Sequence, residues 1–218
     1  MGRVLVACER SGIVRDAFRS RGHDAVSCDL VPTEAPGPHI IGNALAVLGD
    51  GWDLLIAHPP CTYLANLANR WLWQTTPPAT PGVLVGPARW AALIEGATFF
   101  RELLAAPIGR VCVENPVMGR YARMVVGVGP SQVVQPYWFG HTNTKATGLW
   151  LRGLPALRAT DDRRADTYAL PYRDRAISHL MAPSPDRTEK RSRTYPGLAD
   201  AMAAQWGAGI LEGADDGL

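Results

Sequence analysis

The chain has 218 residues, of which 47% are hydrophobic and 19% are charged, and its formal net charge is +2. This length suits one α/β domain with a sizeable core and a short appendage, and the composition is that of an ordinary globular protein. No apolar run is long enough for a membrane-spanning helix, and the first residues lack the pattern of a signal peptide, so we expect an intracellular protein.

Strand and helix patterns alternate along the first half of the chain. Apolar runs predict buried strands, and apolar residues at helical spacing predict helices. The predicted strands cover residues 3–8, 24–29, 40–43, 52–57 and 110–113, and the predicted helices cover residues 13–21 and 89–105. Such alternation favours an α/β fold with a parallel, doubly wound sheet.

Two later segments interrupt this alternation. Residues 66–88 include a stretch rich in Pro, Thr and Gly, which predicts a mobile loop after Cys61. Residues 152–193 carry ten basic side chains against six acidic ones, almost all of the basic ones arginine. Guanidinium groups bind phosphates, although a solvated surface would have the same composition. We divide the chain into a core at 1–151, this Arg-rich segment, and a closing helix with an acidic tail at 194–218, and we expect that helix to start near Pro196 and end before Gly207.

Polar residues follow the predicted strands at their carboxyl ends. In a parallel sheet these ends meet at one edge, where ligands bind. The residues concerned are Glu9, Ser11 and Gly12, then Asp29, Asn43, residues 58–61, and residues 114–116. No G-x-G-x-x-G fingerprint for a dinucleotide is present.

Cys61 is the strongest candidate for chemistry among the four cysteines. Cys8, Cys28 and Cys112 lie in or at the ends of strand-like runs, whereas Cys61 follows two prolines in a loop. None of the four has the spacing of a zinc ligand, so we expect no metal. A thiol held there suits nucleophilic attack, and burial would raise the pKa of Glu114 so that it acts as an acid near neutrality. A buried thiol and an ordinary strand-end carboxylate remain the alternative.

These motifs, in this order, resemble the DNA cytosine-5 methyltransferase family. The segment 4–12 is similar to its first cofactor motif, residues 58–61 (His-Pro-Pro-Cys) to its nucleophile motif, and Glu114-Asn115 to its Glu-Asn motif. Residues 135–151 and 193–197 resemble the downstream and closing motifs of the compact version found in phages and prophages, over roughly residues 3–207.

The resemblance implies a Rossmann-like class I methyltransferase fold and S-adenosylmethionine as cofactor, in the cytoplasm of a bacterial or phage-infected cell. It implies Cys61 as the nucleophile at carbon 6 of cytosine and Glu114 as the acid at ring nitrogen 3, so that carbon 5 takes the methyl group. It places the cofactor on Cys8, Glu9, Ser11, Gly12, Asp29, Asn43 and Pro59, and the substrate on Pro60, Arg70, Asn115, Lys145, Arg163 and Arg164.

Three departures from the family bear on the substrate. Position 43 is Asn where the family has an acid, the Gln-x-Arg-x-Arg motif is replaced by a segment containing Lys145, and about forty residues stand where the family has a target-recognition domain. We expect DNA as substrate, with free dCMP as the alternative. A non-catalytic nucleic-acid-binding protein stays open, whereas His58 and Cys61 disfavour an amino-methyltransferase.

Overall fold

The structure is a computed structural model that describes residues 1–78, 82–182, 184 and 187–212. Among these residues we find no helix with the length and apolar character needed to cross a membrane. The strands are β1 (Arg3–Ala7), β2 (Asp24–Asp29), β3 (His39–Ile41), β4 (Leu54–Ala57), β5 (Arg110–Pro116), β6 (Gln132–Val134) and β7 (Thr147–Arg152). The helices are α1 (Ile13–Arg19), α2 (Gly86–Leu104), α3 (Arg120–Val126), α4 (Arg164–Ala169), α5 (Tyr172–Arg175), α6 (Ile177–Leu180), α7 (Arg187–Ser192) and α8 (Pro196–Glu212), with 3-10 helices η1 (Ala44–Val47), η2 (Asn66–Trp73) and η3 (Pro136–Trp138).

The seven strands found in the described residues form one sheet in the order β3-β2-β1-β4-β5-β7-β6. Strands β1 to β5 pair in parallel, whereas β7 runs antiparallel to both β5 and β6. The chain therefore reverses its winding between β1 and β4, and ligands bind at such a switch point in open α/β sheets. This Rossmann-like order is that of the class I methyltransferase fold, so the expected fold class is confirmed.

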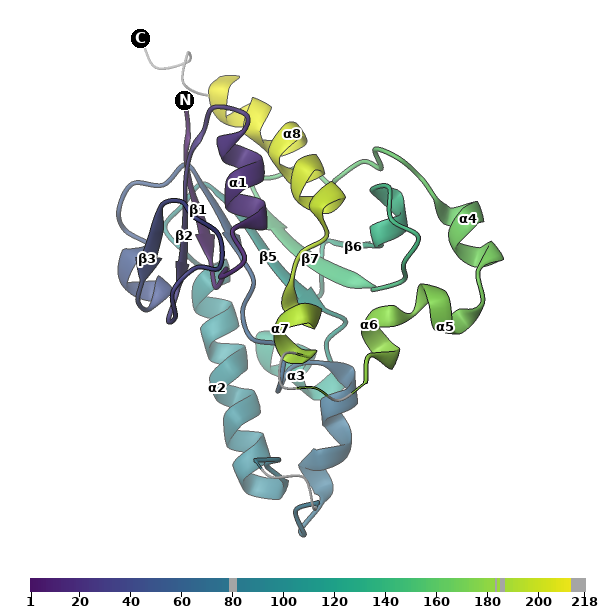
Figure 1. Cartoon of the computed structure of the whole chain (residues 1–218). Helices are drawn as coiled ribbons and strands as arrows, with labels where there is room; N and C mark the ends of the chain where they lie inside the picture. The colour runs from purple at the N-terminus through teal and green to yellow at the C-terminus, as the bar shows by residue number, and fades with distance from the viewer. Residues whose placement is uncertain (79–81, 183, 185–186, 213–218) are drawn as a thin grey trace.

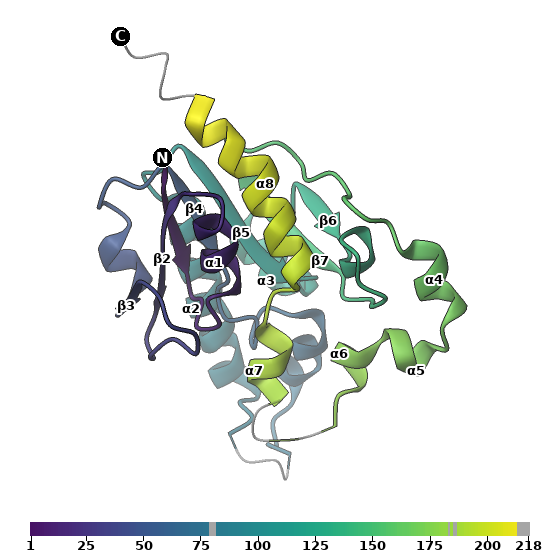
Figure 2. The same cartoon turned by 45° about the horizontal axis from the view of Figure 1, so that its top comes forward.

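Each face of the sheet packs against its own hydrophobic core. Successive strand residues point to opposite faces, so Leu5 and Leu55 join the core under α2 and α3, whereas Val4 and Leu54 join the core under α1 and α8. Figures 1 and 2 show α1 and α8 lying together over one face, with α4 to α6 forming an arc beside β6. Because helices cover both faces of the sheet, a site can form at the carboxyl edge of the parallel strands.

The structure corrects three of the predicted boundaries. Strand β5 continues to Pro116, so Glu114 lies within the strand instead of after it. The segment 66–88 contains η2 and the first turn of α2, with Leu72 buried; residues 79–81 lie outside the described part. The closing helix runs past Gly207 to Glu212, and this glycine leaves room for His23, whose Nε2 would lie 2.6 Å from an added Cβ.

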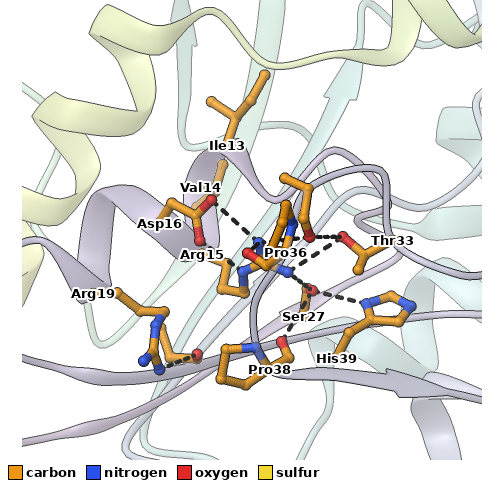
Figure 3. A network of polar contacts seen from close by, with 12 residues as sticks. Ile13, Val14, Arg15, Asp16, Arg19, Ser27, Thr33, Pro36, Pro38 and His39 are labelled. Atoms are coloured by element: carbon orange, nitrogen blue, oxygen red, sulfur yellow. Dashed lines mark hydrogen bonds and ion pairs between the residues drawn. The ribbon is translucent and has the colours of Figure 1, made fainter.

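A buried arginine ties α1 to the loop that follows β2. The Arg15 side chain is fully buried and pairs with Asp16 at 2.8 Å. Its guanidinium also donates to Ser27 Oγ at 3.2 Å, to Thr33 Oγ1 at 3.3 Å and to the Pro36 carbonyl at 3.0 Å (Figure 3). Because a buried charge needs this full set of partners, Arg15 holds the loop after Asp29 against the start of α1.

Replacing Arg15 by Met should lower the free energy of unfolding by roughly 3 kcal/mol, because it removes a buried guanidinium and leaves its buried hydrogen-bond partners unsatisfied. Urea unfolding followed by circular dichroism measures this loss. Arg19→Met, one turn along the same helix, is the matched control, since Arg19 is exposed and donates one long bond, 3.4 Å, to the Ala25 carbonyl. Its loss should stay below about 0.5 kcal/mol; equal losses from the two variants would contradict a structural role for Arg15.

Candidate active site

The carboxyl ends of the central strands set four polar side chains in one row. Ala57 of β4 is in register with Val113 of β5, so the next residues, His58 and Glu114, are neighbours. In the same way Ala7 of β1 is in register with Ala57 and with Cys28 of β2, which places Cys8 between His58 and Asp29. The sequence prediction that these strand ends converge is therefore correct at the level of backbone register.

His58 and Glu114 form a buried ion pair at the centre of this row. His58 Nδ1 lies 2.8 Å from Glu114 Oε2, and about a tenth of each side chain is exposed. The second ring nitrogen, Nε2, is buried with no hydrogen-bond partner in the described part of the chain. The pair thus shares a proton at Nδ1, and Nε2 of the same ring is left without a hydrogen-bond partner among the described residues.

The charges of this pair correct the prediction for Glu114. Burial by itself raises the pKa of Glu114, but the hydrogen bond and charge of His58, together with the charge of Lys145, outweigh it and hold the pKa below the ordinary value. Burial lowers the pKa of His58, and here the hydrogen bond and charge of Glu114 outweigh it and raise the pKa. These directions favour an ionised Glu114 over the expected protonated one, because its nearest neighbour is a base that competes for the proton.

The loop that carries Cys61 is anchored on both sides. The buried Asn115 amide donates to the Pro59 carbonyl at 3.1 Å, and Arg89 of α2 donates to the Thr62 carbonyl at 2.9 Å. Pro59 is buried, whereas Pro60 is exposed. Asn115, which the sequence suggested for substrate contact, thereby holds the loop that carries Cys61.

Cys61 is partly accessible and surrounded by charges of both signs. Burial raises the pKa of the Cys61 thiol, as does the charge of Glu114, while the charges of Lys145 and Arg191 lower it. The net pKa is raised, so the resting group is a thiol, and its activation requires a base or the loss of the neighbouring negative charge. The charges of Glu114, Lys145 and Arg191 thus all act on the Cys61 thiol.

The residues after β1 form a carboxylate-capped helix start. Glu9 is buried, and its carboxylate accepts from the Val14 amide at 2.7 Å, from the Arg15 amide at 3.1 Å and from Ser11 Oγ at 3.3 Å. Gly12 precedes α1 in the left-handed region, at φ 75°, which glycine adopts without steric cost. The positive end of α1 is therefore occupied by the protein's own carboxylate.

Cys8, Asp29 and Asn43 complete the other candidates for cofactor contact. Cys8 has a positive φ of 56°, which is strained for a residue with a side chain, and burial followed by the charges of Asp29 and Cys28 raises its pKa to about 12. Asp29 Oδ1 accepts from the Val31 amide at 3.2 Å, and Asn43 Oδ1 accepts from the Leu45 amide at 3.1 Å, capping η1. Cys8 and Asp29 lie in the row at the sheet edge, whereas Asn43 has a structural role of its own.

The candidate substrate residues separate into two groups. Lys145 acts on Cys61 and Glu114, as described, and its Nζ donates to the Arg191 carbonyl at 2.8 Å. Arg163 and Arg164 are exposed beside α4, where they pair with Asp161 at 2.9 Å and Asp162 at 3.8 Å, away from α1 and the sheet edge in Figures 1 and 2. Arg70 stacks on Trp71, 4.3 Å from the ring centre. Of these four basic residues, Lys145 is the one whose charge acts on Cys61 and Glu114.

Sequence reasoning did not assign two functional candidates, His58 and Arg191. His58 directly precedes the two prolines and Cys61 at a strand end, which is a signal that was present in the sequence. Arg191 carries no such signal, because it is one of many arginines in residues 152–193 and only the packing of α7 brings it near Cys61.

Among known proteins, this chain matches only solved structures. No protein-family description matches the chain, and none of the curated proteins matches it. Among the solved structures, the chain is similar to one described as a candidate DNA modification methyltransferase encoded within a prophage (E. coli), with a TM-score of 0.42 and 12% identity. The match covers 69% of this chain and 46% of that one, so the chain spans about half the length of this neighbour.

The His58–Glu114 pair should stabilise the fold most in weakly acidic solution. Because the folded pKa of His58 is raised above 6.5, its contribution is complete below that pH and is lost as pH rises through the folded pKa. Because the folded pKa of Glu114 is lowered below 4.5, its contribution is complete above that pH and is lost as pH falls through the folded pKa. His58→Asn keeps a neutral donor near the Nδ1 position, so the wild-type advantage in melting temperature should peak between these two pH values.

Melting curves of the two proteins from pH 4 to pH 9 measure this advantage. A constant difference across the range would mean that no proton is shared between the two side chains.

Proposed function

We propose that this chain is a methyltransferase that transfers a methyl group from S-adenosylmethionine to carbon 5 of cytosine, through a covalent bond between Cys61 and carbon 6. The observation that carries the proposal is the presence of a partly accessible thiol and a buried, hydrogen-bonded imidazole–carboxylate pair at the carboxyl edge of a Rossmann-like sheet, with the charge of Glu114 acting on the thiol. A nucleophile and an acid for the ring that it attacks are the two groups that such an addition needs.

The residues around α1 fit the proposed cofactor better than a dinucleotide. A dinucleotide places its pyrophosphate on the helix N-terminus, but the Glu9 carboxylate already accepts from two amides there. A second anion would meet that carboxylate at close range, whereas a cationic sulfonium would be attracted to it. Asp29, at the end of β2, is placed to accept from ribose hydroxyls. When bound, S-adenosylmethionine supplies an electrophilic methyl group.

In the first step, the net change is the movement of one proton from the Cys61 sulfur to ring nitrogen 3. The Cys61 S–H bond breaks and a bond from Sγ to carbon 6 forms, while the displaced ring electrons reach nitrogen 3, which takes up a proton. Glu114 is ionised in the free protein, so we infer that His58 is the source: its Nδ1 proton passes to Glu114 and on to nitrogen 3, and the thiol proton restores the pair. Removing negative charge from Glu114 in this step also lowers the pKa of Cys61, since that charge raises it.

The later steps return the site to its first state. Carbon 5, now part of an enamine, would form the new bond to the methyl group as the methyl–sulfur bond of the sulfonium breaks and the thioether leaves. A base would then remove the carbon 5 proton, and the Sγ–carbon 6 bond would break as nitrogen 3 gives back its proton. Uracil carries a proton on nitrogen 3 and cannot accept one there, so the His58–Glu114 pair favours cytosine.

A covalent trap tests the proposal. Fluorine at carbon 5 cannot leave as a cation, so 5-fluorocytosine in a DNA strand, or 5-fluoro-dCMP, should leave an adduct with the wild-type protein when S-adenosylmethionine is present. Mass spectrometry should detect this adduct, and Cys61→Ser should abolish it. Cys112→Ala is the control, because Cys112 is buried in the core under α1 and α8, and it should keep the adduct. The absence of an adduct with both probes would favour the alternative of a non-catalytic nucleic-acid-binding protein.

The pH profile of turnover tests the role of His58. Wild-type turnover should fall on the alkaline side as the imidazolium loses its proton. In His58→Asn that fall should disappear, and turnover at pH 6 should drop by about 100-fold, within the range for loss of one acid–base group. Glu114→Gln should lose at least as much at every pH while keeping cofactor affinity. An unchanged alkaline fall in His58→Asn would rule out His58 as the proton source.

A further inference from the structure

A basic hollow lies between α6, α7, the start of α8 and the loop before β7. Its volume is about 350 Å³, and its lining includes Lys145, Lys190, Arg191 and Arg193. Among the described residues that line it, none is acidic. A cavity of this size admits a ligand on the scale of a small molecule, and its lining is suited to an anion.

The positive charges of this hollow are only partly neutralised by the protein. Arg193 pairs with Glu34 at 2.6 Å and with Glu189 at 3.0 Å, so its charge is balanced. Lys145 Nζ donates to a backbone carbonyl, that of Arg191, and its charge also acts on the Glu114 carboxylate. Within the described residues no carboxylate pairs with the guanidinium of Arg191. Arg191 therefore faces the hollow without a counter-charge of its own, and Lys145 faces it without a carboxylate in hydrogen-bond contact.

The same two cations act on the reacting atom. The charges of Lys145 and Arg191 both lower the pKa of Cys61, and such an effect requires proximity because charge interactions weaken with distance. The Tyr195 ring lies beneath Lys145, with Nζ 5.8 Å from its centre, and Tyr195 also lines the hollow. The two cations that line the hollow thus also act on the Cys61 thiol.

We propose that Lys145 and Arg191 bind the phosphate of the cytosine nucleotide whose ring reacts with Cys61. The inference rests on the proposed function and names the part of its substrate that the hollow recognises. A guanidinium offers two parallel donors to phosphate oxygens, and an ammonium adds a point charge. Arg163 and Arg164, the residues suggested by sequence, fit this role less well because Asp161, Asp162 and Asp166 pair with them.

Equilibrium binding of dCMP and of deoxycytidine, which lacks the phosphate, tests the inference without turnover. Wild-type protein should bind dCMP on the order of 10- to 100-fold more tightly, as expected for one or two charge-assisted hydrogen bonds. Arg191→Gln should remove most of this preference, and Lys145→Gln should reduce it while keeping a donor for the Arg191 carbonyl. The double variant Arg163→Gln/Arg164→Gln is the control and should keep the preference.

Three results would overturn the assignment. Equal binding of the two probes by wild-type protein would show that no phosphate is recognised, and a wild-type preference in Arg191→Gln would place the phosphate elsewhere. If Arg191→Gln weakened binding of S-adenosylmethionine but left the dCMP preference intact, the anion held would be the carboxylate of the cofactor. Melting temperatures of the variants, compared with wild type, separate these effects from unfolding.

A third probe separates the two sources of the phosphate. If the substrate is a DNA strand, a short single-stranded oligonucleotide with one cytosine should bind more tightly than dCMP, with an affinity that falls as salt rises. If the substrate is the free nucleotide, dCMP should bind at least as tightly as the oligonucleotide. Arg191→Gln should weaken the preferred probe in both cases. If the protein prefers dCMP but forms no fluorinated adduct, the phosphate site stands and the proposed reaction is wrong. If the adduct forms without a preference for the phosphate, the reaction stands and the phosphate site is wrong.

Discussion

The ion pair between His58 and Glu114 is the interaction on which the rest of the site depends. It exists because β4 and β5 are in parallel register, so that the residues following Ala57 and Val113 lie side by side. Its burial makes each partner necessary to the other, since a buried charge without its counter-ion is costly. The pair decides the ionisation of Glu114, and through the charge of Glu114 it raises the pKa of Cys61.

Two hydrogen bonds hold the loop that carries Cys61. Asn115 fixes the backbone before the thiol through Pro59, Arg89 fixes the backbone after it through Thr62, and β5 supplies both Asn115 and Glu114. Trp73 packs edge-on against Trp90 and Tyr121, with ring centres 5.5 Å and 5.8 Å away, so part of the segment expected to be a mobile loop packs against α2 and α3.

Local charge balance separates the arginines that build the fold from those available to a ligand. Arg15 is buried among its partners, Arg163 and Arg164 pair with neighbouring aspartates, and Arg193 bridges two glutamates. Arg191 differs from all of them, and composition alone does not distinguish it. An arginine-rich segment therefore indicates a phosphate site only where the fold leaves a guanidinium without a carboxylate.

The sequence by itself determined the α/β class, the order of the strands that carry polar ends, and Cys61 and Glu114 as candidates, because apolar periodicity and strand-end motifs are local properties. Only the tertiary structure decided the ionisation of Glu114, the capping role of Glu9 and the place of Arg191. Each of these depends on groups distant in the chain or on backbone amides, such as His58 beside Glu114, 56 residues apart. Burial alone predicts a neutral carboxyl; the partner that reverses this result is known only once the strands are paired.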